Sequence, residues 1–434
     1  MNALNKQILR LSIPNIVTNI TVPLLGLVDL AMMGHLDDPV YIGAIALGGA
    51  IFSLIYTGFG FLRMGTTGFT AQAFGSNVQR EITLILYRAT SVAVILAAML
   101  IILQFPIEWL AFFLLDGSDD VKSFAREYFQ IRILAAPATL SLYALHGWFL
   151  GMQHAKIPMI LAIVINTINI LLNFVFIIGL DMTSDGVAMA SVIAQYSGLI
   201  LALIFLRYRF HKFLTRHKLT VIFDWQALKM FFVVNGDIFI RTLLLILSLT
   251  FFTSMSARIS DKILAINTIL FQFFFLFSYF ADGFAFAGES LVGKARGAGD
   301  KILLNDTISR LFSWGWGAAL VTSLLFLGGF DLIIRIMTDN EMLIQQARTY
   351  RWWIIILPLT SVAAFIWDGV YIGLIASRAM RNSMIIASLL VYLPAYYLGV
   401  GSLHNHALWL ALNLFMISRG ALLWYMAKFT ISRP

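Results

Sequence analysis

The sequence has no cysteine and few charged residues, and each shortage excludes a class of protein. Without a thiol, the chain can form neither a disulfide framework nor a thiolate metal site. Only 12% of its 434 residues are charged, about half the share found in soluble domains. Hydrophobic residues make up 60%. These proportions predict an all-α polytopic membrane protein, because helices satisfy their own backbone groups in lipid.

Signatures of enzyme chemistry are also missing. The sequence contains no glycine-rich phosphate loop, no HExxH and no nucleophile elbow. We therefore expect no enzyme activity, no cofactor and no use of ATP. The net charge of +8 would suit nucleic acid, but the basic residues are spread over short loops. We expect membrane lipid and small molecules as partners, and no nucleic acid.

Long apolar runs predict twelve transmembrane helices. A helix crosses about 30 Å of hydrocarbon with about 20 residues. Runs of that length cover residues 11–35, 41–65, 82–105, 125–152, 155–180, 186–207, 226–255, 262–292, 303–330, 347–373, 380–402 and 405–430.

Loop charges predict the orientation of these helices. Basic residues gather in every second loop, most densely in RYRFHKFLTRHK at 207–218, and acids such as Asp116 and Asp339 occupy the others. An excess of Lys and Arg marks the cytoplasmic side. Both termini are therefore predicted to be cytoplasmic, and the short basic start (residues 1–10) is expected to be no cleaved leader.

An internal repeat predicts two halves. Gln72-Ala-Phe-Gly75 corresponds to Lys294-Ala-Arg-Gly297 at an offset of 222 residues, as two further motif pairs do, and Pro137 corresponds to Pro358 at 221. Six spans per copy make the repeat parallel, with its axis along the membrane normal. We predict two six-helix lobes, 1–206 and 226–434, joined by a cytoplasmic linker, 207–225.

The first span carries an acid, Asp29. Asn15, Thr18, Asn19 and Gly26 precede it at steps of three and four and form one helical stripe with it. Intramembrane acids are costly and usually face a cavity or a bundle interior. Burial favours the protonated carboxyl, so Asp29 is predicted to exchange a proton. The alternative is that it only holds its helix against Asn169. A proline at 23 is expected to bend this helix.

Several segments resemble the multidrug and toxic compound extrusion family, and in particular its DinF branch. They are NITVPLLGLVDLAMMGHL (19–36), FLRMGTTGFTAQAFG (61–75), NGDIFIRTLL (235–244), ADGFAFAGESLVG (281–293), WDGVYIG (367–373) and MRNSM (380–384). The resemblance covers nearly the whole chain. It implies export of cationic or amphipathic compounds in exchange for protons or sodium, from the cytoplasmic membrane of a bacterium.

The resemblance also implies which residues couple transport to ions. The proton site of the DinF branch maps onto Asp29. The family's fifth helix usually carries Asn-x-x-x-Asp, but here the corresponding residues are Asn169 and Asn173, and an amide cannot titrate. Asp29 is then expected to carry the coupling alone. In the sodium-coupled branch the acids lie on helices seven and ten. Asp368 resembles the second of these, whereas Arg241 in the first position would repel sodium.

The second lobe is predicted to hold the substrate cavity. Asp282 and Asp368 would attract a cation, and Phe274, Phe277 and Tyr279 would add cation–π contacts. Arg241 is included as a neighbour of these acids. The alternative is that the phenylalanines only pack or face lipid.

An inner gate is predicted from charges at similar depth in the two halves. Under the repeat, Arg63 lies near the position equivalent to Asp282, and Glu289 shares a helix face with Asp282. The alternative is pairing within one lobe, of Arg241 with Asp282 or Asp368. His146 is expected to be a packing residue, with a proton relay as the alternative.

The sequence thus predicts a monomeric, proton-coupled exporter of amphipathic or cationic compounds. The alternatives are a sodium-coupled exporter that uses acids of the second lobe, a lipid or lipid-precursor flippase, and a membrane scaffold without transport.

Overall fold

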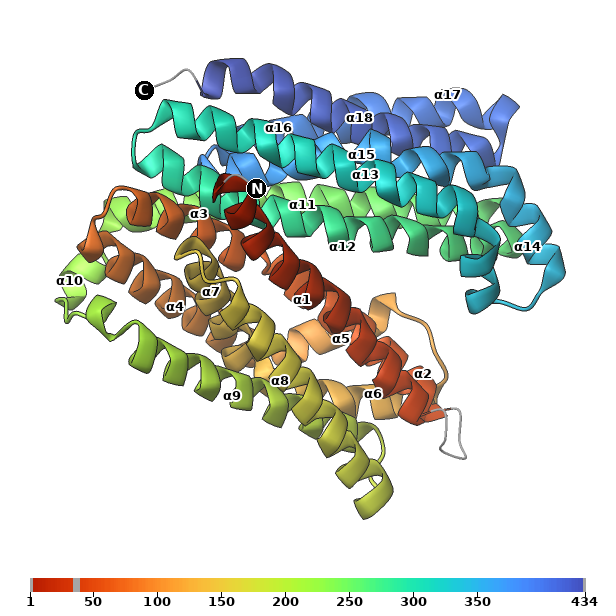
Figure 1. Cartoon of the computed structure of the whole chain (residues 1–434). Coiled ribbons are helices and arrows are strands. Elements are labelled where there is room, and N and C mark those ends of the chain that lie inside the picture. Colours follow the sequence, from red (N-terminus) through yellow and green to blue (C-terminus); the bar gives the residue numbers. More distant parts are fainter. Residues whose placement is uncertain (1–2, 34–39, 432–434) are drawn as a thin grey trace. The chain divides into compact units, whose positions relative to one another are not determined.

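The computed structural model describes residues 3–33 and 40–431, without the side chains at 22–25 and 27–33. Over these ranges the chain is helical and contains no strand (Figure 1). In chain order, the segments are α1 (Ala3–Met33), α2 (Val40–Gly58), α3 (Phe61–Gly75), α4 (Gln79–Ile102), α5 (Gln104–Leu114), α6 (Asp119–Arg132), η1 (Ile133–Ala135), α7 (Ala136–Gly151), α8 (Lys156–Asn173), η2 (Phe174–Gly179), α9 (Ser184–Arg209), η3 (His211–Phe213), α10 (Leu219–Ile222), α11 (Trp225–Ile259), α12 (Asp261–Gly297), α13 (Lys301–Met337), α14 (Glu341–Ala347), η4 (Arg348–Tyr350), α15 (Arg351–Gly373), α16 (Ser377–Ile386), η5 (Ala387–Tyr392), α17 (Leu393–Leu403) and α18 (Asn405–Thr430).

Among the described residues, eleven helical segments are long and apolar enough to cross a membrane. They coincide with the eleven runs predicted after the first one. The run predicted at 125–152, for example, is the continuous segment Asp119–Gly151. The first run lies in α1, which is helical over 31 residues, as far as Met33; its last two residues, 34–35, are outside the described residues. The prediction of an all-α membrane protein is confirmed.

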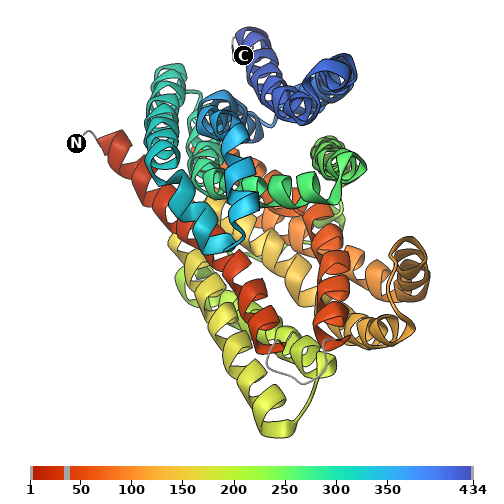
Figure 2. The same ribbon diagram turned by 90° about the vertical axis from the view of Figure 1, so that its right-hand side faces the viewer.

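The chain folds into two compact units. The first unit is Val17–Phe231, and the second unit is Phe232–Pro434 together with Met1–Ile16. The division passes through α1 and α11. In the first unit α7 packs on α3 and α4, and α8 packs on α9; in the second unit α15 packs on α12, α13 and α18. Figures 1 and 2 show the long helices running side by side within each unit.

Glycines bring two helix pairs into backbone contact. In the first unit, a Cβ on Gly147 of α7 would fall on the carbonyl oxygen of Arg63 in α3. In the second unit, a Cβ on Gly369 of α15 would fall on the carbonyl oxygen of Ala285 in α12. Glycines four residues later, at 151 and 373, extend both contacts by one turn. Small residues at this spacing allow membrane helices to approach closely.

The segment predicted as a linker is held against α4 by hydrogen bonds to its backbone. Arg88 donates from Nε to the carbonyl of Ile222, at 3.0 Å, and from Nη2 to that of Val221, at 3.1 Å. Three more side chains on the same face of α4, Gln79, Thr83 and Tyr87, donate to the carbonyls of residues 212, 213 and 215. We call these four side chains the α4 clamp. Every acceptor is a main-chain oxygen.

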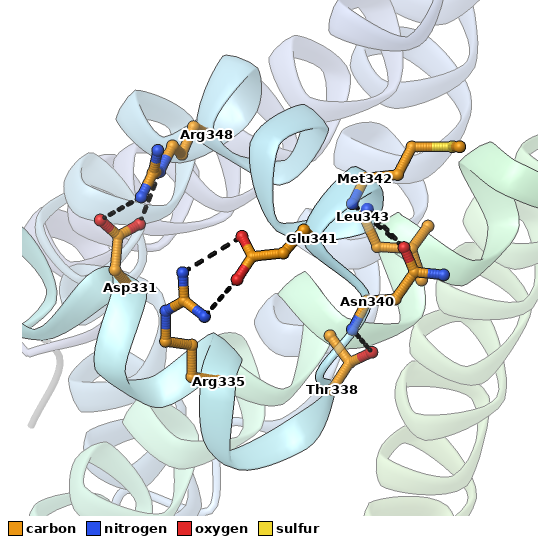
Figure 3. Close-up of polar contacts among 8 residues, drawn as sticks. All are labelled: Asp331, Arg335, Thr338, Asn340, Glu341, Met342, Leu343 and Arg348. Atoms are coloured by element: carbon orange, nitrogen blue, oxygen red, sulfur yellow. Dashed lines mark hydrogen bonds and ion pairs between the residues drawn. The ribbon is translucent and has the colours of Figure 1, made fainter.

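Two exposed ion pairs close the corner between α13 and α14 (Figure 3). Arg348 binds both oxygens of Asp331, at 2.9 Å each, and Arg335 binds both oxygens of Glu341. Asn340 caps α14 by accepting from the backbone nitrogens of residues 342 and 343. The paired geometry and the cap fix the start of the segment that leads into α15.

Candidate functional site

Asp368 of α15 lies buried between two arginines from other helices of the second unit. Arg419 of α18 donates from Nη2 to Oδ2 of Asp368 at 2.7 Å, and Arg241 of α11 donates to the same oxygen. The three residues are between 2% and 8% exposed. We call them the Arg–Asp–Arg cluster. The carboxylate of Asp368 thus binds two fixed cations, Arg419 also interacts electrostatically with Asp282, and the Nε of Arg241 has no partner in the part of the chain that the structure describes.

The ligand set of this cluster does not suit a metal ion. Sodium and divalent ions prefer several oxygen ligands without adjacent cations, whereas the oxygen of Asp368 already accepts two charge-assisted hydrogen bonds. Among the described residues, no group of three or more His, Cys, Asp or Glu side chains is placed to hold a metal. The ion pair between Arg241 and Asp368, one of the two pairings predicted within a lobe, is present.

A second buried acid of the same unit is also fully paired. Asp237 of α11 is 4% exposed. It accepts from Oγ of Ser377 at 2.8 Å and from Nη1 of Arg381 at 2.6 Å, both on α16. These contacts hold α16 against α11. Because Arg381 neutralises the charge of Asp237, a structural role is favoured for this acid.

The aromatic residues predicted to line the substrate cavity lie on α12. Phe274 and Phe277 are 4% and 1% exposed, and both contact the ring of Phe365, with centroids 6.3 and 6.0 Å apart. Tyr279 and Asp282 are half-buried on the same helix. The two phenylalanines thus pack on Phe365. Substrate contact with this helix stays a prediction.

The residues predicted for the gate fall in different units. Arg63 is half-buried on α3 of the first unit, whereas Asp282 and Glu289 lie on α12 of the second unit, Glu289 only 1% exposed. A gate formed by these residues stays a prediction.

In the first unit, Asn169 and Asn173 form a buried chain of amides. Asn173 donates to Oδ1 of Asn169 at 3.1 Å, and Asn169 donates to Oγ of Ser191 in α9 at 3.0 Å. All three side chains are at most 5% exposed. These hydrogen-bonded side chains are therefore neutral groups that can donate or accept hydrogen bonds, and they stand where a second carboxylate would otherwise lie.

A hydrogen bond sets α8 in register with α1. Asn166 of α8 donates to the carbonyl of Thr21 at 2.9 Å, and both views show α8 and this part of α1 running in the same direction (Figures 1 and 2). At 1.5 Å per residue, the backbone of Asp29 lies about 12 Å beyond Thr21, and that of Asn173 about 10 Å beyond Asn166. The two backbones are thus at similar levels. The side chain of Asp29 is outside the described residues.

A further polar region of the first unit was not predicted as a site. Two buried atoms there have no partner among the described residues, Nη1 of Arg132 and Nε2 of His146, and the buried hydroxyls of Tyr56 and Thr139 lie close to each other. The carbon Cζ of Arg132 lies 6.0 Å from the ring centroid of Tyr56. Buried polar groups need partners, so this region is suited to hold water or a polar ligand. His146 alone had been singled out.

Arg132 and Arg419 were missed although the sequence carries a signal for both. Each is an arginine within a segment that is long and apolar enough to cross a membrane, and charged residues in such segments are candidates for a functional role because burying them in lipid is costly.

Comparison with known proteins identifies the family. The MatE family model matches residues 14–175 and 238–398. DNA damage-inducible protein F of Escherichia coli is 38% identical over 423 residues, which cover 96% of this chain and 90% of that protein. Multidrug and toxin extrusion protein 1 of Danio rerio is 26% identical over 355 residues, 78% of this chain and 57% of that protein.

Solved structures agree with the fold. An outward-facing multidrug resistance MATE family transporter of the MOP superfamily superimposes with a TM-score of 0.87, over 99% of this chain and 96% of that one. At 18% identity this likeness establishes the fold alone. The resemblance to the DinF branch is confirmed by the identity with the E. coli protein. The chain belongs to the MatE family of multidrug and toxin extrusion transporters and is an integral membrane protein.

Proposed function

We propose that this transporter exports amphipathic, cationic compounds in exchange for protons, and that Asp29 is the coupling acid. The observation that carries the proposal is the register between α1 and α8. Given the hydrogen bond from Asn166 to the carbonyl of Thr21, the backbone of Asp29 is at about the same depth as the hydrogen-bonded side chains of Asn173, Asn169 and Ser191. Amides can donate to a charged carboxylate and accept from a neutral one, so the same partners would serve both protonation states.

The cluster in the second unit supports protons over sodium. With Asp368 held by Arg241 and Arg419, a sodium ion would have to displace a guanidinium and then lie beside two cations. Coupling to protons does not require a free cation-binding position beside Asp368. The flippase alternative has no comparable support, since it rests on the two-lobe fold alone.

We further propose twelve spans in two parallel lobes with both termini in the cytoplasm. The span added to the eleven described is α1. Helix ends repeat at one interval: α3 and α12 end at Gly75 and Gly297, and α7 and α15 end at Gly151 and Gly373, each pair 222 residues apart. The glycine contacts on Arg63 and Ala285 also differ by 222. A shared interval in both helix bounds and packing supports a duplicated six-helix unit.

The test is efflux of a fluorescent cation from proteoliposomes. We expect wild-type protein to export the dye under a pH gradient, and Asp29→Asn to abolish this export. Asp116→Asn, which removes an exposed acid of the same unit, is the control and is expected to leave export unchanged. Export that follows a sodium gradient and survives Asp29→Asn would overturn the proposal.

A further inference from the structure

An open groove of about 1270 Å³ runs along the surface of the second unit. Its walls are α13 and α18, and its floor is α15, on which both helices pack. Gly420 explains how the floor is made: a Cβ there would meet the Cβ of Ala363 at 2.9 Å. Because α18 rests directly on α15 at this point, the space lies between α18 and α13.

Most side chains that line the groove are apolar, with Asn305, Ser309, Ser313 and Thr360 as the neutral polar ones. Phe312 and Trp316 line it from α13, and Ile417 and Trp424 line it from α18. Trp316 is 46% exposed and Trp424 57% exposed. Side chains of this kind on the outer face of a membrane helix contact acyl chains, because lipid is the solvent there.

One end of the groove is basic. Lys301 is the first residue of α13, and Lys428 lies two residues before the end of α18. Both lysines line the groove, and no acidic residue is among its lining. Nζ of Lys428 lies 4.6 Å from the ring centroid of Trp424, so the wall of the groove holds this charge in place. Because a helix begins and a helix ends here, this end lies at the membrane–water interface.

We propose that this groove binds one acidic phospholipid, with its phosphate between Lys301 and Lys428 and its acyl chains along Trp316 and Trp424. Basic pockets between transmembrane helices select anionic headgroups. A free phosphate would leave the apolar walls uncovered, and a transported cation would meet two positive charges. None of the residues that line this groove belongs to the unit that holds the proposed coupling acid, Asp29. Lipid binding here is a property in addition to the proposed export.

The first test is native mass spectrometry of the full-length transporter titrated with phosphatidylglycerol or phosphatidylcholine. Wild type is expected to bind one phosphatidylglycerol more tightly than phosphatidylcholine. With about a tenfold effect per 1.4 kcal/mol and about 1 kcal/mol per lysine, Lys301→Gln with Lys428→Gln is expected to weaken phosphatidylglycerol on the order of 30-fold. The control, Lys262→Gln with Arg378→Gln, removes two charges of the same unit outside the groove and should bind as wild type does.

A second variant separates the walls from the charges. Ala421 lines the groove, so Ala421→Trp fills it and leaves both lysines. This variant is expected to lose the tightly bound lipid while its melting temperature stays close to that of wild type. Equal affinity of wild type for both lipids, or phosphatidylglycerol binding that survives both sets of changes, would overturn the proposal. Displacement of the bound phosphatidylglycerol by an equimolar cationic dye would do so as well, because it would identify the groove as a substrate site.

Discussion

Asp368 is a buried acid that two arginines of other helices bind. Its Oδ2 oxygen is the acceptor for two guanidinium groups, and the site is shielded from water. Removing one partner of a buried ion pair costs more than the pair contributes, because the remaining charge keeps its desolvation penalty. Here the change would leave two guanidinium groups without the carboxylate that both of them bind.

The variant Asp368→Asn is therefore expected to destabilise the protein by about 3 kcal/mol. Thermal unfolding in detergent measures this as a lower melting temperature. The control is Asp339→Asn, which removes an exposed acid of the same unit and is expected to have little effect. Equal melting temperatures for both variants would show that the cluster is not a stabilising unit.

Sequence reasoning reached only part of this cluster. It brought Asp368 and Arg241 together as one of two alternatives, because both interrupt apolar runs. Arg419 escaped it, although Arg419 interrupts an apolar segment just as Arg241 does, because its partner lies on another helix, 51 residues away in the chain, and was not matched to it. The same holds for Arg88, whose acceptors are 133 and 134 residues away.

Among the helices, the runs of about 20 apolar residues were predictable and the shorter segments were not. The helix α5 has 11 residues with Trp109 and Phe113 exposed, in a stretch predicted as a loop between two spans. It is too short to cross the membrane, so a search by span length passes over it. The π-helices η2 and η5 lie inside predicted spans, and their composition does not differ from that of α-helix.

The glycine contacts give a prediction for helix packing. Gly369→Ala would place a methyl group on the carbonyl of Ala285 and force α15 away from α12, at a cost of about 1–3 kcal/mol. Gly317→Ala, where no atom lies within 4 Å, is expected to be neutral or to stabilise α13 by up to about 1 kcal/mol. Melting temperatures of the two variants test this. A Gly369→Ala protein as stable as wild type would contradict it.

The α4 clamp gives a prediction for the linker. Arg88→Gln removes the two bonds to the carbonyls of α10, so amide hydrogens at 219–222 are expected to exchange faster while those of α7 do not change. Hydrogen–deuterium exchange followed by mass spectrometry measures this. Arg80→Gln, an exposed arginine on the same helix, serves as the control. Protection of 219–222 that is the same in both variants would argue against the clamp.

On the scale of the whole molecule, the absence of cysteine allows the predicted topology to be tested by labelling. Asp116→Cys is expected to react with a membrane-impermeant maleimide in intact cells, because its loop is predicted to be external. Arg216→Cys is expected to react only after the cells are permeabilised. The unmodified protein, which has no thiol, provides the blank. Labelling of Arg216→Cys in intact cells would reverse the orientation.

The fold class and the family could be predicted from sequence because both rest on features repeated along the chain. Hydropathy marks every span, and the two glycine motifs recur at one interval. The division into units was less predictable. The two units part at Ile16 and Phe231, inside helices α1 and α11, whereas changes in composition direct attention to the basic linker at 207–225.

The chemistry of the α4 clamp has a consequence for variation in this protein. Its donors are side chains, but every acceptor is a peptide carbonyl, which nearly any residue supplies. Exposed side chains of the segment 212–222, such as Lys212 and Arg216, can therefore be exchanged without loss of these hydrogen bonds, whereas Phe213, which contacts Trp148, and the buried Ile222 also hold the segment by packing. Mutational scanning is expected to find tolerance at the exposed positions of the segment and constraint at Gln79, Thr83, Tyr87 and Arg88.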